Sequence, residues 1–225
     1  ALEDGMAALL PRPAARLCAL ELLLWVCTAM WLFRRGGGQP GEGEFSYHGR
    51  SPLGTFLWLV LLTAPLELLA WELLIPWAWL RLLLLVAGFY GALWIVGLYA
   101  SLRVLPHRLE PGGVRLRHGL LADGWVPYDA IADVEPERAQ PPGKGEGLRL
   151  SPKGTIAYLA VGGRTDLTLT LRTPRALDGF LRPTPLVSAI RLAADEPERL
   201  AAALRRRIAP AEGGVDGEGK IPVSA

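Results

Sequence analysis

The chain has few cysteines and little net charge, and each shortage excludes a class of protein. Only two of its 225 residues are cysteines, Cys18 and Cys27. Nine residues turn an α-helix through about 900°, so these thiols face opposite sides of a helix and we expect neither a disulfide between them nor a shared metal ion. The 24 Lys and Arg residues nearly balance the 22 Asp and Glu residues. A net charge of +2 provides no argument for nucleic-acid binding.

The sequence also lacks the patterns that carry common chemistry. The histidines, His48, His107 and His118, have no ligand spacing and no cysteine near them, so we expect no metal site. The Gly-Lys pair within residues 143–147 lacks the strand, the Lys-Ser/Thr ending and the helix of a phosphate-binding loop, and predicts a flexible loop. No Ser–His–acid set or catalytic carboxylate pair stands out. The prediction is therefore no enzymatic activity, no catalytic residue and no cofactor.

What the chain does contain is a series of long hydrophobic runs. Its composition is 51% hydrophobic, and the apolar residues crowd before Arg103. A helix needs about 20 apolar residues to cross about 30 Å of hydrocarbon. Three segments meet this length: residues 14–33, 53–75 and 77–102. We therefore predict an integral membrane protein whose residues 1–103 form a region of three transmembrane helices.

The residues at and between the hydrophobic runs predict how the spans are connected. The first run is too long for a signal peptide and contains Glu21, so it is interpreted as a span. Residues 36–50 are Gly-rich and predict a flexible connector. Pro76 separates the second and third spans and predicts a tight hairpin between them. Indole rings favour the headgroup layer, and three of them cluster at this turn: Trp71, Trp77 and Trp79.

The positions of the arginines predict the orientation. One side of the three spans carries Arg12, Arg16 and Arg81. The other side carries Arg34, Arg35, Arg50, Arg103 and Arg108. Cytoplasmic segments near span ends are enriched in Lys and Arg. We therefore predict a multi-pass protein of the inner (plasma) membrane with its carboxy-terminal domain in the cytoplasm.

Three acids, Glu21, Glu67 and Glu72, lie within or near the predicted spans. An ionisable group inside a membrane is a hypothesis of function by default. Together with Arg81 these acids are a possible intramembrane polar site, as in a small membrane transporter or enzyme that brings its acids together. The other interpretation is structural, with Glu72 near the hairpin turn pairing with Arg81, and we favour it.

After Val104 the pattern changes to short alternating runs. Leu167, Leu169 and Leu171 alternate with polar residues, which is the period of a half-buried strand. Seven strands are predicted, at residues 104–109, 114–118, 125–134, 148–151, 155–161, 166–172 and 186–192. We expect two antiparallel sheets that bury their apolar faces against each other.

One amphipathic helix is predicted to end the domain. Asp195 is the expected N-cap, with Pro197 in the first turn. Leu200, Leu204 and Ile208 fall on one face, which we expect to close an open corner of the two sheets. The domain is predicted to cover residues 104–209, followed by a disordered tail at residues 210–225. This order of elements is that of a pleckstrin-homology (PH) sandwich or barrel.

Two segments carry a resemblance to a family. Residues 107–121 form a strand–turn–strand pattern that ends in a glycine, and residues 126–135 begin Val-Pro-Tyr-Asp-Ala-Ile. The combination resembles bacterial PH-like domains that follow membrane spans. This resemblance implies a membrane-anchored module that binds or scaffolds membrane protein complexes or lipid headgroups. A narrower similarity, at residues 147–150 and 155–159, is to photosynthetic-complex assembly proteins with three spans and a PH-like domain.

Three arginines, Arg108, Arg115 and Arg117, are the candidate binding residues. They resemble the basic first-strand residue and the Arg-x-Arg of the second strand with which eukaryotic PH domains hold phosphoinositides. Glu110 in the intervening loop argues against a multivalent phosphate site, so we interpret the set as a strand face that contacts anionic lipid. The predicted partners are the lipid bilayer and other membrane proteins or a second copy of the chain.

Overall fold

The computed structural model of the protein describes five segments: residues 11–33, 43–49, 51–143, 146–179 and 182–208. Several predictions fall outside these residues. They are the disordered tail at 210–225, most of the connector at 36–50 with Arg34, Arg35 and Arg50, and residues 144–145 of the predicted flexible loop.

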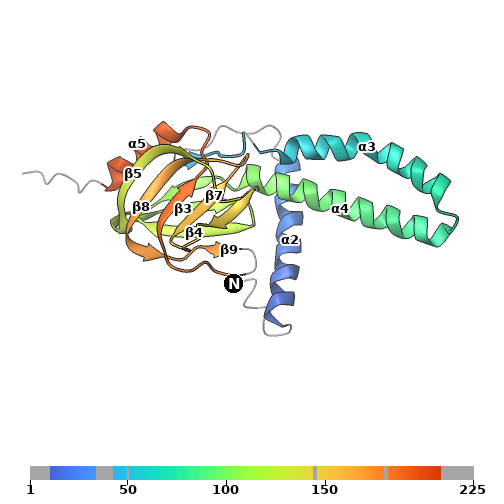
Figure 1. The fold of residues 1–225 in the computed structure, drawn as a ribbon, viewed down its shortest axis with the longest axis horizontal. Helices are drawn as coiled ribbons and strands as arrows, with labels where there is room; N and C mark the ends of the chain where they lie inside the picture. The colour runs from blue at the N-terminus through green and yellow to red at the C-terminus, as the bar shows by residue number, and fades with distance from the viewer. Residues whose placement is uncertain (1–10, 34–42, 50, 144–145, 180–181, 209–225) are drawn as a thin grey trace, which may run out of the picture.

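Two helices, α3 (Leu53–Leu74) and α4 (Ala78–Val104), are long and apolar enough to cross a membrane. They form the predicted hairpin, which projects away from the rest of the molecule (Figure 1). Helix α2 (Arg12–Phe33) covers the first predicted span, but its apolar part, Leu17–Phe33, is shorter than the other two. Two of the three predicted spans thus have the length and composition of a membrane helix, and α2 runs crosswise to them (Figure 1).

The turn of the hairpin follows from Pro76. A proline forces the residue before it out of the helical region. Ile75 is accordingly extended, with φ −109° and ψ 108°, and α3 ends at Leu74. A second proline, Pro65, lies inside α3, where it cannot donate the i→i−4 hydrogen bond. Figure 1 shows that α3 bends along its length while α4 is straighter.

The carboxy-terminal domain contains two five-stranded sheets. The first has the order β1-β2-β3-β4-β9 and the second β5-β8-β10-β7-β6. The strands of the first sheet are β1 (Glu44–Phe45), β2 (His107–Glu110), β3 (Gly113–His118), β4 (Ala122–Pro127) and β9 (Asp178–Gly179). Those of the second are β5 (Ile131–Ala139), β6 (Gly147–Leu150), β7 (Ile156–Ala160), β8 (Thr165–Arg175) and β10 (Val187–Leu192). The two sheets are separate layers among the described residues and do not close into a barrel.

Two predicted strands have different bounds in the structure. The strand predicted at 104–109 begins at His107, because α4 continues to Val104. The strand predicted at 125–134 is divided by a 3-10 turn at Tyr128–Ala130 into β4 and β5. The short strands β1 and β9 are additional to the prediction.

The expectation of wholly antiparallel sheets was wrong at one pair. β7 and β8 run in opposite directions on either side of the turn at Gly162-Gly163, and β10 lies between them. Because β10 is antiparallel to β8, it must be parallel to β7, and it is. A chain segment that enters between two strands of a hairpin cannot be antiparallel to both.

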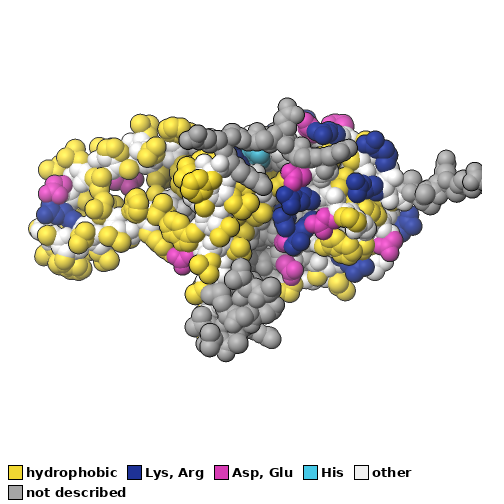
Figure 2. Space-filling view, turned by 180° about the vertical axis from the view of Figure 1, so that it is seen from behind, with side chains coloured by type: hydrophobic (Ala, Val, Ile, Leu, Met, Phe, Trp, Pro, Cys, Tyr) yellow, Lys and Arg dark blue, Asp and Glu magenta, His cyan; other side chains and the backbone are white. Residues whose placement is uncertain are grey.

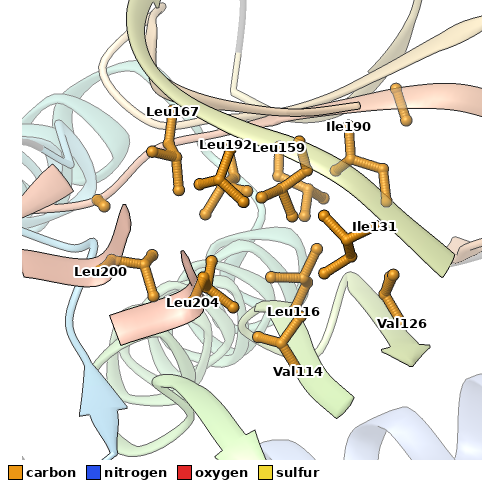
Figure 3. Packing of buried hydrophobic residues seen from close by; sticks show 14 of the residues in the cluster. Val114, Leu116, Val126, Ile131, Leu159, Leu167, Ile190, Leu192, Leu200 and Leu204 are labelled. Carbon is orange, nitrogen blue, oxygen red and sulfur yellow. The ribbon is translucent and has the colours of Figure 1, made fainter. Parts of the chain in front are cut away.

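Helix α5 (Pro197–Ile208) lies where the sequence predicted the closing helix. Leu200 and Leu204 are completely buried, and Ile208 packs at the edge of the same cluster. Figure 3 shows these leucines beside Leu116 of β3 and Leu192 of β10, so both sheets and the helix share one core. In addition, Arg205 donates two hydrogen bonds to the carbonyl oxygen of Val134 on β5, at 3.0 and 2.5 Å.

The predicted N-cap has a different partner. The carboxylate of Asp195 accepts hydrogen bonds from the backbone N–H of Gly49, at 3.1 and 3.2 Å. Gly49 precedes α3, so Asp195 connects the membrane half of the chain to the start of α5. This contact joins residues far apart in sequence, and no local pattern predicts it.

Candidate functional site

The three candidate arginines lie on the outer face of the first sheet. Alternation along β3 places Val114 and Leu116 in the core, and therefore places Arg115 and Arg117 on the opposite face. Arg108 of β2 is directly opposite Arg115 in the register of the two strands. The structure thus brings all three predicted side chains onto one surface.

Each of these arginines has an acidic partner on a neighbouring strand. Arg108 pairs with Glu44 of β1 at 2.6 Å. Arg115 holds Asp123 of β4 in a bidentate contact, with its Nε 3.0 Å and its Nη2 2.7 Å from the two carboxylate oxygens. Arg117 is directly opposite Asp123 in register, but its Nε is 3.7 Å from the carboxylate. Asp123 therefore binds Arg115 closely and Arg117 only weakly.

The pKa shifts reflect this difference. The hydrogen bonds that Arg115 donates to the Asp123 carboxylate raise the pKa of the Arg115 guanidinium. Burial lowers the pKa of Arg117, and the nearby Asp123 only partly opposes it. Both remain fully charged near neutral pH, because an arginine begins from a pKa above 12. Arg117 is thus a partly buried cation whose Nε lies 3.7 Å from the Asp123 carboxylate that it shares with Arg115.

A cleft of about 420 Å³ opens beside these two arginines. One wall comes from α2, through Leu20 and Leu23, and the other from the first sheet and its loops, including Arg115, Arg117 and Asp123. The cleft therefore has one apolar wall and one mixed wall, to which Asp178 and the loop residues Leu120 and Leu121 also contribute. Such a cleft suits an amphiphile, with a polar group against Arg117 and an apolar group along α2.

A buried polar cluster lies beside the cleft and attaches the segment before α3 to the sheet. The hydroxyl of Tyr47 accepts a hydrogen bond from the N–H of Gly119 at 2.6 Å and donates one to the carbonyl of Leu105 at 3.0 Å. The ring of Tyr47 stacks on His107, with 4.5 Å between centroids. Burial raises the pKa of Tyr47, so the phenol stays protonated.

Both histidines of this region are neutral structural groups. The Nδ1 of His107 accepts the backbone N–H of Arg117 at 3.1 Å, which leaves Nε2–H to donate to the carbonyl of Ala193 at 3.1 Å. Burial lowers the pKa of His107 to about 4, and burial does the same for His118. Among the described residues, no group of three His, Cys, Asp or Glu side chains is arranged to hold a metal ion.

The four residues of the possible intramembrane polar site have separate local partners. Glu72 forms an ion pair with Arg81 at the hairpin turn. Glu67 accepts a hydrogen bond from Thr63 Oγ1 at 3.3 Å and lines an apolar groove of about 370 Å³ between α3 and α4. Glu21 accepts a hydrogen bond from the hydroxyl of Tyr90 at 2.5 Å. These hydrogen bonds and ion pairs connect none of the three acids to another.

No family model, curated protein or solved structure matches the chain. The resemblance to bacterial PH-like domains therefore stays a prediction, and the candidate function depends on the geometry of this chain.

Sequence reasoning identified the arginines but missed the residues that shape the cleft. Asp123 follows the hairpin after β3 and is opposite Arg117, a register that only strand pairing reveals. Leu20 and Leu23 belong to a helix predicted to lie in the membrane, with no signal that they would contact the sheet. The sequence signal for a cross-strand ion pair was the pair of basic residues Arg115 and Arg117, followed after a turn by the acidic Asp123.

Proposed function

We propose that this protein is a non-enzymatic, membrane-anchored PH-like module that holds a charged β domain at the bilayer surface to bind lipid headgroups or membrane protein complexes. The observation that carries the proposal is the continuity of α4. Its first turns are apolar and exposed, as at Leu82 and Phe89, whereas Ala100, Leu102 and Val104 near its end are buried. Of these buried residues, Leu102 packs with Val161 and Ala193 of the β domain, so one unbroken helix connects a lipid-compatible surface to a water-compatible domain.

The PH-like part of the proposal is supported by the arrangement of the domain. A meander of β2, β3 and β4 packs against a second sheet, and α5 covers the remaining opening of the core. Two features differ from a simple PH pattern: the parallel pair of β10 and β7, and the additional short strands. Both sheets and α5 nevertheless contribute residues to one core, which is the arrangement expected from the PH-like prediction.

The distribution of side-chain types supports a location at a membrane. In Figure 2, hydrophobic side chains cover the hairpin and α2, whereas Lys, Arg, Asp and Glu gather on the β domain. Arg103, near the end of α4, lies on the domain side of the hairpin. By the positive-inside rule we place the β domain in the cytoplasm and the protein in the inner membrane.

The proposed ligand contact is the cleft beside Arg117. This residue is half-buried, only weakly paired with Asp123 and adjacent to the apolar wall formed by α2. An anionic headgroup would pair with Arg117, and an acyl chain would lie along the α2 wall at the half-buried Leu23. Near an anionic membrane one such cation contributes about 1 kcal/mol, or about fivefold in binding.

Lipid selection by the full chain tests this proposal. The protein is reconstituted in nanodiscs containing equal amounts of phosphatidylcholine and phosphatidylglycerol, and native mass spectrometry measures the lipids it retains. We expect enrichment of phosphatidylglycerol in the parent and about fivefold less enrichment in Arg117→Gln. The matched control is Arg172→Gln, an exposed arginine on β8 of the other sheet, which should behave as the parent. Equal enrichment in Arg117→Gln and the parent would contradict headgroup binding in this cleft.

The alternative is a small transporter or membrane enzyme that uses Glu21, Glu67 and Glu72. Such a protein needs its acids gathered in one interior site. The separate partners of these acids, Tyr90, Thr63 and Arg81, favour the binding module over this alternative.

A further inference from the structure

The position of α2 gives a topology that the hydropathy of the sequence does not. We propose that α2 does not cross the bilayer but lies along its surface, with its exposed apolar face inserted at the boundary between headgroups and acyl chains. The proposal rests on insertion of the α3–α4 hairpin, which is part of the proposed function. Its consequence is that the amino terminus and the β domain lie on the same side of the membrane.

The hairpin itself defines the level of the bilayer surface. Its turn carries Trp77 and Trp79, both exposed, which suit the far headgroup layer. About 20 helical residues rise about 30 Å, so a helix that begins at Ala78 reaches the near surface close to Gly97. From Gly97 onward α4 contains its buried residues, and Leu102 packs with Val161 and Ala193 of the β domain.

Helix α2 crosses α4 at this level. A Cβ atom added to Gly97 would be 3.0 Å from Leu24 Cδ2 and 3.3 Å from Thr28 Oγ1, so the two helices touch there without a side chain between them. One turn further, the rings of Trp31 and Tyr99 meet edge to face with centroids 5.8 Å apart. Figure 1 shows α2 running across α4 rather than along it, between the hairpin and the β domain.

The two sides of α2 have different environments. One side is buried: Ala15, Ala19, Leu20, Leu24 and Cys27. Leu24 contacts Gly97 of α4, and Leu20 lines the cleft beside the first sheet. The other side is exposed and also apolar: Leu22, Trp25, Val26, Leu32 and Phe33. An exposed apolar face of this kind, which includes a tryptophan, is typical of helices that lie in the membrane interface.

The occupant of this face is lipid, because the face is continuous with the apolar surface of the hairpin. Figure 2 shows hydrophobic side chains extending from the hairpin onto α2, with the charged side chains beyond them on the β domain. The apolar part of α2, Leu17–Phe33, is 17 residues or about 25 Å long, which is less than the hydrocarbon thickness. A helix of this length that is fixed across the hairpin contacts one leaflet only.

The first test measures the side of the membrane on which the amino terminus lies. In full-length protein carrying Cys18→Ala and Cys27→Ala, one cysteine is introduced by Ala7→Cys or by Gln140→Cys. Both are treated in intact cells with a membrane-impermeant thiol reagent. We expect the two to label alike, and to be shielded if the β domain is cytoplasmic. Labelling of one position but not the other would mean that α2 crosses the bilayer, and would overturn the proposal.

The second test measures depth with nitroxide labels in liposomes. Leu22 and Phe33 are exposed on nearly the same side of α2 and about 16 Å apart along its axis. Labels there should report the same shallow depth. Leu82 and Phe89 on α4 are the control and should differ in depth by about 10 Å. A similar difference on α2 would overturn the proposal, as would low accessibility to both lipid-soluble and water-soluble relaxing agents, which a covering second copy would cause.

The same labels distinguish this proposal from the proposed function. If the α4 labels are accessible to water and alkaline carbonate releases the chain from membranes, the hairpin is not inserted and both proposals fail. If the α4 labels are deep and only the α2 result differs, the membrane-anchored module remains and the surface position of α2 is wrong.

Discussion

The α3–α4 hairpin and the β domain differ in how far their apolar side chains are buried within the chain. Leu116, Leu167 and Leu169 of the β domain are completely buried, whereas α3 has no buried residue and Leu62 is 78% exposed. The side chains are of the same kind, so their chemistry does not explain the difference. The β domain completes its packing within the chain, whereas the hairpin leaves apolar side chains exposed, and the proposed insertion would cover them with lipid.

The polar groups repeat this contrast. In the β domain they are matched within the chain, as in the bidentate pair of Arg115 and Asp123 and the hydrogen bonds of His107. In the hairpin, the ion pair of Glu72 and Arg81 lies at the turn, which the proposed insertion would place near water and headgroups. Glu67 lines an apolar groove, where it accepts a hydrogen bond from Thr63. The polar groups of the β domain are therefore paired within the chain. Those of the hairpin depend, in the proposed membrane position, on how far they lie from the bilayer surface.

The largest expected effect comes from making a buried position of the β domain as polar as its surface. Leu204→Asp places a carboxylate where the side chain is 0% exposed. The lost burial and the desolvated charge together cost several kcal/mol, against a total stability of about 5–15 kcal/mol. We expect the full chain in detergent to lose its cooperative thermal unfolding, measured by circular dichroism. Leu204→Met keeps the volume and should cost under about 1.5 kcal/mol. An unchanged melting temperature for the Asp variant would mean that α5 is not docked on the sheets.

Acid should destabilise the β domain through His107. Burial lowers its pKa from 6.5 to about 4, so the unfolded chain binds a proton at pH values where the folded chain does not. Stability from this group is therefore complete above pH 6.5 and is lost as the pH falls toward 4, by about 3 kcal/mol in total. The measurement is the free energy of unfolding in urea between pH 7 and 4. His107→Gln should be less stable at pH 7 but less sensitive to acid, although His118 still contributes. An identical pH dependence in this variant would contradict the assignment.

The smallest expected effect is at the contact that joins the two regions. Gly97→Leu forces a side chain against Leu24 and Thr28, at an expected cost of about 1–3 kcal/mol. Gly91→Leu is the matched control on the same helix, because a Cβ there would have nothing within 4 Å. The readout is the native Cys27 thiol on α2, which is 3% exposed, in protein carrying Cys18→Ala. Loosening α2 should speed its reaction with a thiol reagent about tenfold in Gly97→Leu. Equal rates in the two glycine variants would mean that α2 does not depend on this contact.

Sequence patterns predicted the elements better than their partners. The period of β8, the Pro76 turn and the leucine stripe of α5 are local signals, and each element lies where it was predicted. Two other features depend on chain segments that are far apart in sequence. Asp195, the predicted N-cap, instead contacts Gly49, and β10 pairs in parallel with β7. Periodicity reports which face of an element is apolar, and it carries no information about what covers that face.

For the candidate site the division is similar. Alternation along β3 was enough to place Arg115 and Arg117 on one face of a strand. Asp123 binds Arg115 more closely than Arg117, and this follows from the register of β3 and β4. Leu20 and Leu23 form the facing wall, and this follows from the docking of α2.

The sequence by itself determined that this protein has an apolar helical half and an alternating β half, since hydrophobic runs and two-residue periods are properties of contiguous residues. Only the tertiary structure decided that α2 turns across α4 at Gly97, that its buried side faces the sheet and that its exposed side joins the surface of the hairpin. The physical reason is that an apolar helix of this length is equally compatible with a bilayer core, a protein core and an interface. Its contacts with the rest of the chain, and not its own composition, select among them.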